Sequence, residues 1–282
     1  SNAGARLFIQ HRLEGQDLQQ LKKGTSDAEK VTVSFYVKTN KSGVYTVELY
    51  DVDNTRSISQ TITVSDANWN RYTLTFDGDT TGTLDNDNAN SLDLIIHLIA
   101  GTTYTGGTFS TSWSSATDNT RVSSSNVNIG DSTDNNFEIT GIQLEVSEQA
   151  TPFEHRSFGE ERQLCYRYYY RTPDSVTGGQ AANEAFPCVG NMDGSTIGAF
   201  IFIFPVPMRA APTAIEQSGT ASDYSLRVTS DSNGTSVPSA SGFTSEKALV
   251  NLVSSGAGKT GGQGAFMRME STDAFIAFSA EL

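Results

Sequence analysis

The stretch GIQLEVSEQATPFEHRSFGEERQLCYRYYYR, residues 141–171, lies between two halves of the chain that both read as β-rich. Apolar and polar residues alternate over residues 142–146, which is typical of a half-buried β-strand. Pro152 then favours an extended backbone at the preceding residue, so the chain leaves this strand straight. The stretch therefore predicts the end of one domain and the start of another.

A short helix is expected in the connector. Ser157 followed three residues later by Glu160 is the pattern of a capping box, and residues 160–165 would form the helix. The tyrosine cluster at residues 166–171 suits a strand. We therefore divide the chain into a first domain, a connector and a second domain at residues 4–150, 151–162 and 163–282.

Alternating apolar residues recur through the first half of the chain. They mark seven segments, at residues 7–13, 31–38, 45–49, 58–64, 72–76, 92–98 and 137–146. Two packed antiparallel sheets bury the apolar faces of such one-sided strands economically. In the second half, residues 197–204 are apolar on both faces, which predicts a strand buried on both sides, with one side facing the core or another subunit. The expected fold class is all-β. It consists of an N-terminal β-sandwich of the jelly-roll type and a smaller C-terminal β-sandwich.

Composition excludes some partners. The 282 residues include 19 basic and 32 acidic side chains, for a net charge of −13. Such a surface repels the phosphates of nucleic acids and of anionic membranes. The sequence contains no run of about 18 apolar residues, so no membrane-spanning helix is predicted. With only two cysteines in the sequence, Cys165 and Cys188 are expected to be free buried thiols.

Several of these segments resemble a known family. The segments VTVSFYVKTN from Val31, NWNRYTLTF from Asn68 and FEITGIQLEV from Phe137 are similar to carbohydrate-binding-module-like jelly rolls of tailed-bacteriophage tail-fibre and receptor-binding proteins. The connector TPFEHR from Thr151 and the segment FPVPMRAAPT from Phe204 resemble the corresponding parts of such fibres.

The resemblance implies a function and a setting. It implies a phage tail protein, made in the host cytoplasm and carried on the virion, that binds a host surface polysaccharide during adsorption. It also implies a homotrimer in contact with other phage tail proteins. The alternatives are a purely structural or trimerisation module, and an accessory module of a polysaccharide-degrading tailspike. Many such jelly rolls bind a structural Ca²⁺ through an aspartate in the final strand, and this chain has none at residues 138–142.

Candidate glycan-binding residues centre on a loop. Tyr104 and Trp113 lie in a Gly/Thr/Ser-rich segment, and sugar sites need an aromatic ring with polar groups nearby. Asp51, Asp53 and Arg56 are added as polar candidates. The competing interpretation is that Trp113 plugs this loop onto the sandwich edge.

Other aromatic residues are open to two interpretations. Trp69, just before a strand, is expected in the core. Tyr36, Tyr50 and His97 lie on the faces opposite the apolar sets of their strands, where they would line a ligand face or pack at an interface.

Neither an enzyme nor a cofactor is predicted. Asp85 and Asp87 provide alternating oxygen ligands of the kind that Ca²⁺ accepts, although such Asp/Asn runs are also ordinary turns. None of the three histidines has a serine or cysteine partner in a recognisable catalytic motif, so we predict a binding protein that is not an enzyme.

Overall fold

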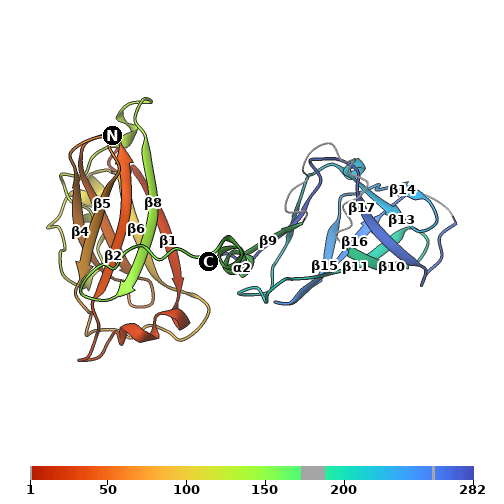
Figure 1. The fold of residues 1–282 in the computed structure, drawn as a ribbon, viewed down its shortest axis with the longest axis horizontal. Helices are drawn as coiled ribbons and strands as arrows, with labels where there is room; N and C mark the ends of the chain where they lie inside the picture. Colours follow the sequence, from red (N-terminus) through yellow and green to blue (C-terminus); the bar gives the residue numbers. More distant parts are fainter. Residues whose placement is uncertain (1, 173–187, 256–257) are drawn as a thin grey trace. The chain divides into compact units, whose positions relative to one another are not determined.

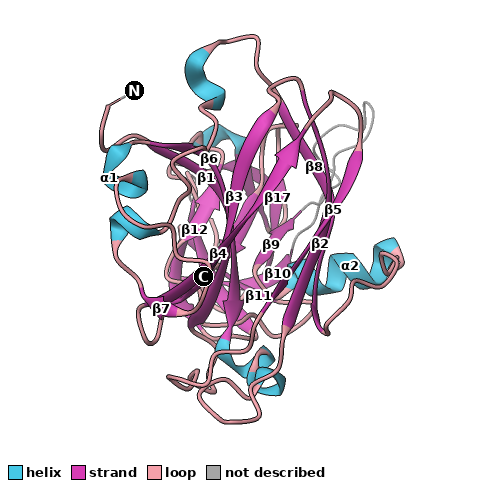
Figure 2. Ribbon diagram, turned by 90° about the vertical axis from the view of Figure 1, so that its left-hand side faces the viewer, coloured by secondary structure: helices cyan, strands magenta, loops and turns pink. Residues whose placement is uncertain are grey.

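The structure, a computed structural model, describes residues 2–172, 188–255 and 258–282. It divides the chain into two compact units, residues 1–155 and 156–281, each with its own hydrophobic core (Figure 1). Strands dominate, and the helices are short (Figure 2). The predicted all-β fold class is confirmed.

The first unit is an antiparallel β-sandwich. One sheet has the order β1-β6-β3-β4-β7, and the other has the order β5-β2-β8. The strands are β1 (Arg6–Glu14), β2 (Val31–Thr39), β3 (Gly43–Asp51), β4 (Arg56–Val64), β5 (Asn70–Phe76), β6 (Asn90–Ala100), β7 (Ser114–Ser115) and β8 (Phe137–Val146). All seven predicted segments are strands, and only the two-residue β7 was not expected.

Its core follows from the alternation of each strand. Val33, Phe35 and Val37 point inward from β2, and Tyr45 and Val47 face them from β3, all fully buried. Because the side chains of a strand alternate between faces, the residues between these point to the outside of each sheet. The two outer faces are where the unit's polar and aromatic side chains gather.

The second unit is also a β-sandwich, with a seven-stranded sheet β14-β13-β17-β10-β11-β16-β15 and a three-stranded sheet β12-β18-β9. Its strands are β9 (Tyr169–Thr172), β10 (Cys188–Asp193), β11 (Ile197–Ile203), β12 (Ile215–Gln217), β13 (Tyr224–Arg227), β14 (Asp231–Asn233), β15 (Ser239–Phe243), β16 (Lys247–Val253), β17 (Gly264–Met269) and β18 (Ile276–Ser279). Phe200 and Phe202 of β11 pack with Phe278 of β18 between the two sheets.

Helices are confined to short segments. They are α1 (Thr102–Thr105), α2 (Phe158–Tyr166) and the 3-10 turns η1 (Gly15–Asp17), η2 (Gln19–Leu21), η3 (Asp118–Thr120), η4 (Ile129–Asp131) and η6 (Ala221–Asp223). None of the helices in the described ranges is long and apolar enough to cross a membrane.

The connector contains the predicted capping box. Ser157 Oγ accepts from the Glu160 N–H at 3.3 Å, and the Glu160 carboxylate accepts from the Ser157 N–H at 2.9 Å. The strand predicted from Tyr166 was wrong at its start, because Tyr166 is the last residue of α2 and β9 begins at Tyr169. The helix therefore extends one residue into the tyrosine cluster, as far as Tyr166, whose side chain is buried.

One burial prediction was wrong, and another is met on one side. Within a single copy of the chain, Phe200, Phe202 and Phe204 face the core, whereas Ile201 and Ile203 are 53% and 75% exposed, so the face that the sequence allowed to lie against another subunit is the open one. Among the described residues this sheet is packed on one face, so the period of two exposes the alternate residues. Cys165 and Cys188 are both free thiols, but Cys165 is exposed, not buried.

Candidate functional site

An open groove lined by aromatic side chains lies on the outer face of the three-stranded sheet in the first unit. It has a volume of about 430 Å³ and is lined by Tyr36, Trp69, Thr140, Gly141, Phe153 and His155. Tyr36 projects here because its neighbours in β2, Phe35 and Val37, point into the core. We call this surface the aromatic groove.

Trp69 forms one wall of the groove and is presented by a rigid turn. The Asp66 carboxylate accepts from the Asn68 N–H at 2.8 Å and from the Asn70 side-chain amide at 2.9 Å. The indole is 45% exposed, so the expectation of a core position was wrong. The Lys38 ammonium lies 5.9 Å from its ring centroid. An aromatic side chain left this exposed on a fixed turn is available to a ligand.

The opposite wall comes from residues 147–155, which fold back over the sheet after β8; we call them the strap. Gln143 forms two hydrogen bonds with the strap. Its amide nitrogen donates to Thr151 Oγ1 at 3.0 Å, and its amide oxygen accepts from the Glu154 N–H at 2.8 Å. Glu145 accepts from the Thr151 N–H at 3.1 Å, and Arg71 donates to the Thr151 carbonyl. These bonds hold the strap on both sides of Phe153.

Two strap residues face the groove. The rings of Phe153 and His155 meet edge to face, with centroids 4.9 Å apart. Phe153 is half-buried and His155 is exposed. This is a favourable aromatic geometry, so the pair keeps one orientation without a ligand.

A glycine shapes the floor of the groove. The pairing of β2 with β8 shifts by one residue between Ser34 and Tyr36, which places a β-bulge at Gly141. Gly141 has φ +59°, and a Cβ there would lie 3.1 Å from a carbon of the Tyr36 ring. The bulge needs a left-handed residue, and the close approach of Tyr36 leaves no room for a side chain.

The groove combines aromatic faces with a polar rim. The Thr140 side chain lines it, and the Lys38 ammonium pairs with Glu138 at 3.0 Å beside Trp69. Aromatic faces accept the apolar side of a sugar ring, while hydroxyl, amine and carboxylate groups bind its hydroxyls. The arrangement can bind a ligand with one flat apolar face and polar edges. It contains no nucleophile held by a base.

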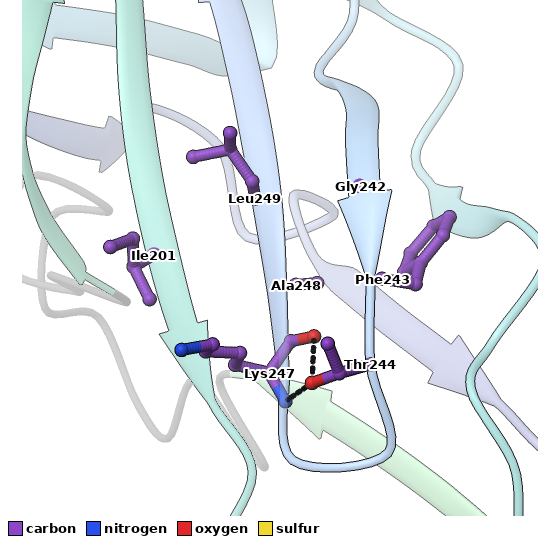
Figure 3. A pocket seen from close by; sticks show the side chains of 7 residues that line it. All are labelled: Ile201, Gly242, Phe243, Thr244, Lys247, Ala248 and Leu249. Atoms are coloured by element: carbon purple, nitrogen blue, oxygen red, sulfur yellow. Dashed lines mark hydrogen bonds between the residues drawn. The ribbon is translucent and has the colours of Figure 1, made fainter.

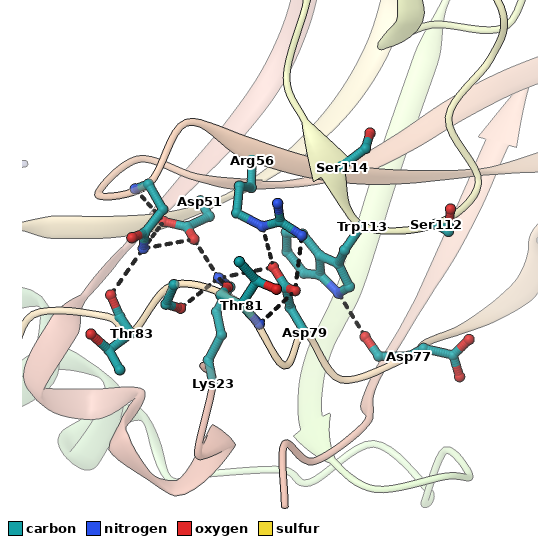
Figure 4. Close-up of polar contacts among 12 residues, drawn as sticks. Lys23, Asp51, Arg56, Asp77, Asp79, Thr81, Thr83, Ser112, Trp113 and Ser114 are labelled. Carbon is teal, nitrogen blue, oxygen red and sulfur yellow. Dashed lines mark hydrogen bonds and ion pairs between the residues drawn. The ribbon is translucent and has the colours of Figure 1, made fainter. Parts of the chain in front are cut away.

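Tyr36 was expected to line a ligand face or an interface and does border the groove, whereas the loop and polar residues predicted to bind glycan lie elsewhere. Three of them, Asp51, Arg56 and Trp113, form one cluster with Lys23 and Asp79, which we call the Lys23 cluster (Figure 4). Arg56 donates twice to Asp79, at 2.7 and 3.0 Å, and the Trp113 indole N–H donates to the Asp77 carbonyl at 2.7 Å. Asp51 is fully buried and Trp113 is half-buried against the core. This geometry fits the interpretation that Trp113 plugs its loop onto the sandwich edge.

Both carboxylates of the Lys23 cluster are committed to ion pairs. Burial raises the pKa of Asp79, but the hydrogen bonds from Arg56 and Lys23 outweigh it and leave the pKa below its ordinary value. The same hydrogen bond raises the pKa of Arg56. Asp79 and Arg56 are therefore both charged at neutral pH, and they hold each other in place.

Tyr104 is not brought to this cluster. It lies on α1 and packs against Arg6, whose guanidinium carbon is 5.0 Å from its ring centroid. Arg6 pairs with Ala100 and Asp51 pairs with Leu92, so the two sites lie at opposite ends of β6. The loop containing Tyr104 and Trp113 thus runs from one end of the five-stranded sheet to the other.

Asp53, Asp85 and Asp87 organise turns. The Asp53 carboxylate accepts from the Asp85 N–H at 2.9 Å, and the Asp87 carboxylate accepts from the Ala89 N–H at 2.9 Å. The part of the chain that the structure describes holds no group of three or more acidic, histidine or cysteine side chains placed to bind a metal. The Ca²⁺ site predicted at Asp85 and Asp87 therefore finds no support.

Tyr50 and His97 lie on the outer face of the five-stranded sheet, beneath residues 101–127. Here the fully buried Glu48 accepts from Arg121 at 2.6 and 3.0 Å and from His97 Nε2 at 2.9 Å. The Arg121 guanidinium also stacks over Tyr50, 4.3 Å from the ring centroid. These four residues form the Glu48 cluster, which fastens the covering loop to the sheet.

Burial sets the charge states of the Glu48 cluster. It lowers the pKa of His97 below its ordinary value, against the opposing pull of Glu48. Burial also raises the pKa of Glu48, but the hydrogen bonds from His97 and Arg121 outweigh it and leave the pKa lowered. Glu48 is therefore a carboxylate and His97 is neutral, its Nε2–H donating to Glu48 and its buried Nδ1 without a hydrogen-bond partner.

The second unit carries an exposed apolar surface. Val189 of β10, Ile201 and Ile203 of β11 and Leu249 of β16 lie on the outer face of the seven-stranded sheet and are 38% to 75% exposed. Ile201 is opposite Leu249 in the register, and both border a groove of about 320 Å³ that also contacts Phe243 and Lys247 (Figure 3). We call Val189, Ile201, Ile203 and Leu249 the apolar row.

Comparison with known proteins yields little. No family model and no curated protein matches the chain. Two solved structures of discoidin II from Dictyostelium discoideum show weak similarity, at 10% identity. They cover 90% of this chain and 74% and 75% of their own chains, with TM-scores of 0.19 and 0.17. At such scores the similarity carries no argument about ligand or mechanism.

Proposed function

We propose that this protein is a non-enzymatic glycan-binding protein, and that the saccharide lies in the aromatic groove. The observation that carries the proposal is the exposed Trp69 facing the Phe153–His155 pair across an open groove floored by Tyr36. Rings held by a turn, a bulge and a hydrogen-bonded strap lose little side-chain freedom on binding. Preorganised rings of this kind suit the apolar face of a pyranose.

Burial favours the groove over the residues predicted from sequence. In the Lys23 cluster, Asp51 is inaccessible, Arg56 is occupied by Asp79 and the indole N–H of Trp113 is already bonded. A sugar there would have to displace charge-assisted hydrogen bonds. In the groove, the charged neighbour of Trp69 is the Lys38 ammonium, 5.9 Å from the ring centroid, and a contact at this distance is weaker than the charge-assisted hydrogen bonds of the Lys23 cluster.

The setting that we propose is the tail of a bacteriophage, where the ligand is a surface polysaccharide of the host cell. The resemblance of the sequence to tail-fibre proteins supports this setting. The net charge of −13 is compatible with a neutral or cationic glycan, which the acidic surface does not repel.

The test is a pair of tryptophan variants in the full chain. We expect isothermal titration with host surface polysaccharide, or a glycan array, to show binding that Trp69→Ala weakens by roughly five- to thirtyfold, because a stacked ring contributes on the order of 1 to 2 kcal/mol. Trp113→Ala should leave the affinity within about twofold. A reducing-end assay on the same mixtures checks that no polysaccharide is cleaved.

Two results would contradict the proposal. One is the absence of binding by the unmodified protein to the host polysaccharide. The other is the reverse pattern, in which Trp113→Ala abolishes binding in a folded protein and Trp69→Ala does not, which would return the site to the loop predicted from sequence.

A second candidate function is assembly of copies of the chain, favoured by the apolar row. A contiguous patch of exposed apolar side chains on a soluble protein marks an interaction site, whereas single exposed apolar residues are ordinary. Val189, Ile201 and Leu249 come from three adjacent strands, so they form a continuous surface. The homotrimer implied by the family resemblance would bury this surface, and the protein would then serve a structural role in the fibre.

Light scattering coupled to chromatography tests the assembly. We expect a trimer that Ile201→Lys combined with Ile203→Lys converts to monomers. Val52→Lys, at an apolar position in the first unit that is 36% exposed, is the matched control and should leave the trimer intact. A monomeric unmodified protein at micromolar concentration would rule out assembly through this face.

A further inference from the structure

Four oxygen atoms surround the ammonium group of Lys23. They are Asp51 Oδ2 at 2.5 Å, Asp79 Oδ2 at 3.0 Å, and the carbonyl oxygens of Thr81 and Gly82, both at 2.9 Å (Figure 4). The side chain of Lys23 is only 4% exposed and those of the two aspartates are no more so. This is a buried cation inside an oxygen cage.

The cage has more oxygen acceptors than the ammonium group of Lys23 has hydrogens to donate. An ammonium group has three N–H donors, so it cannot give a separate hydrogen to each of four oxygens. Two carboxylates and two backbone carbonyls are instead the hard oxygen ligands that Ca²⁺ takes, with water completing six to eight positions. The donor set therefore suits a metal ion better than it suits the lysine.

The two carboxylates are held by groups other than Lys23. The Asp51 carboxylate accepts from the Asn54 N–H at 2.9 Å and from its side-chain amide at 3.0 Å. Asp79 is held by Arg56 at 2.7 Å and by the Thr81 N–H at 3.0 Å. Because these partners remain when Lys23 is shortened, the carboxylates stay in position.

The carbonyl side of the cage is fixed by the backbone. Gly82 has φ +76°, and a Cβ there would lie 2.6 Å from the side-chain carbon of Asn54. Asn54 also donates to the Thr83 carbonyl at 2.9 Å. The segment carrying both carbonyls is thus packed against the same Asn54 that holds Asp51.

We propose that Lys23 is a tethered cation in an oxygen site suited to a divalent metal, and that Ca²⁺ occupies this site when the lysine side chain is shortened. In the natural chain the lysine cross-links the 51–56 and 77–84 segments without a metal. The site differs from the turn at Asp85 and Asp87, and the proposal does not depend on glycan binding.

Terbium luminescence tests the site directly. Tb³⁺ binds in place of Ca²⁺ and emits when a nearby tryptophan is excited, and the Trp113 ring centroid lies 5.2 Å from the Lys23 nitrogen. We expect Lys23→Ala to show sensitised emission that saturates with Tb³⁺ and is displaced by Ca²⁺. The unmodified protein and Lys22→Ala, whose exposed lysine pairs with Glu29, should show none. Adding Trp113→Phe to Lys23→Ala should abolish the emission, which excludes Trp69 as its source.

Thermal unfolding provides a second readout. Lys23→Ala should have a lower Tm than the unmodified protein, and Ca²⁺ at about 100 times its Kd should raise the variant's Tm by roughly 5 °C or more. The Tm of the unmodified protein should not respond to Ca²⁺ or to a chelator. Lys23→Ser serves the same purpose if Lys23→Ala does not fold.

The outcomes are decisive in both directions. Displaceable emission together with a Ca²⁺-dependent Tm rise in a Lys23 variant supports the proposal. A folded variant that shows neither effect overturns it. A Tm rise with K⁺ but not with Ca²⁺ also overturns it, because the cage would then select a monovalent ion.

Discussion

The two outer faces of the first sandwich present similar residue types in opposite environments. On the five-stranded sheet, Tyr50 and His97 lie beneath residues 101–127 and join a buried ion pair. On the three-stranded sheet, Tyr36 borders an open groove with the exposed Trp69. Both faces are built by the residues that alternate with the core, so their strands do not account for the difference.

What differs is the segment laid over each sheet. The loop above the five-stranded sheet brings Arg121, which pairs with Glu48 and closes the face. The strap above the three-stranded sheet brings Phe153 and His155 and stops beside Tyr36, which leaves the face open. In this unit the covering segment that supplies the counter-charge seals a polar face, whereas the one that supplies aromatic rings leaves an open groove.

The largest expected effect comes from opening the sealed face. Glu48→Gln leaves Arg121 buried without its carboxylate, which should lower the free energy of unfolding by about 3 to 5 kcal/mol. Urea denaturation of the full chain, monitored by a signal from the first unit, measures this loss of stability. Glu29→Gln breaks the exposed pair with Lys22 and should cause no measurable change. Equal effects from the two variants would contradict a sealed face.

The two tryptophans should differ in their contribution to stability, because Trp113 packs at the sandwich edge and Trp69 borders the open groove. Trp113→Ala removes a half-buried ring packed against the core, so we expect a loss of about 2 to 3 kcal/mol in the free energy of unfolding. Trp69→Ala should cost less than about 1 kcal/mol, because the ring is 45% exposed. The same denaturation series measures both. A larger loss for Trp69 would mean that the groove is part of the core.

The sealed face should also make stability depend on pH. The folded pKa of His97 lies below its ordinary 6.5 and that of Glu48 below its ordinary 4.5, so the unfolded chain binds protons more readily at both groups. Their contribution is therefore complete above about pH 6.5 and declines as the pH falls, first through His97 and then, below about pH 4.5, through Glu48.

Calorimetry between pH 8 and pH 4 should show the Tm falling by a few degrees over the His97 range. His97→Gln removes this titrating group and should make the fall in Tm below about pH 6.5 shallower, and the slope that remains there comes from His11, whose pKa is also lowered by burial. A Tm that rises on acidification would contradict a neutral buried His97.

The smallest effect tests the floor of the open face. Gly141→Ala should lower the free energy of unfolding by about 1 to 2 kcal/mol, because its positive φ and the nearby Tyr36 ring disfavour a Cβ. It should also weaken glycan binding by displacing Tyr36. Gly159→Ala, where a Cβ meets open space in α2, is the control and should be neutral or slightly stabilising. Unchanged stability and binding in Gly141→Ala would show that the bulge is not needed.

Local signals predicted much of this molecule. The seven alternating segments became strands and the Ser157 capping box formed, because both depend on residues within a few positions of one another. The exposure of Ile201 and Ile203 within a single copy of the chain did not follow from their pattern, for the complementary reason. Whether the second face of an apolar strand is covered depends on distant segments that its own pattern does not encode.

The groove escaped prediction although one signal was present. Gly141 interrupts an otherwise regular strand, and such a glycine marks a bulge or a close approach. Tyr36 was recognised as an outward residue, but Trp69 was assigned to the core and Phe153 was treated only as part of a connector. These residues belong to separate segments, and their meeting depends on how the strap is held.

The sequence by itself determined the seven long strands of the first unit and the short capped helix, because a period of two and a capping box are local properties. Only the tertiary structure decided which outer face is sealed, that Lys23 fills an oxygen cage and that Trp69 faces Phe153. Those outcomes rest on contacts between residues far apart in the chain. Each contact depends on side-chain packing and charge pairing that no local pattern specifies.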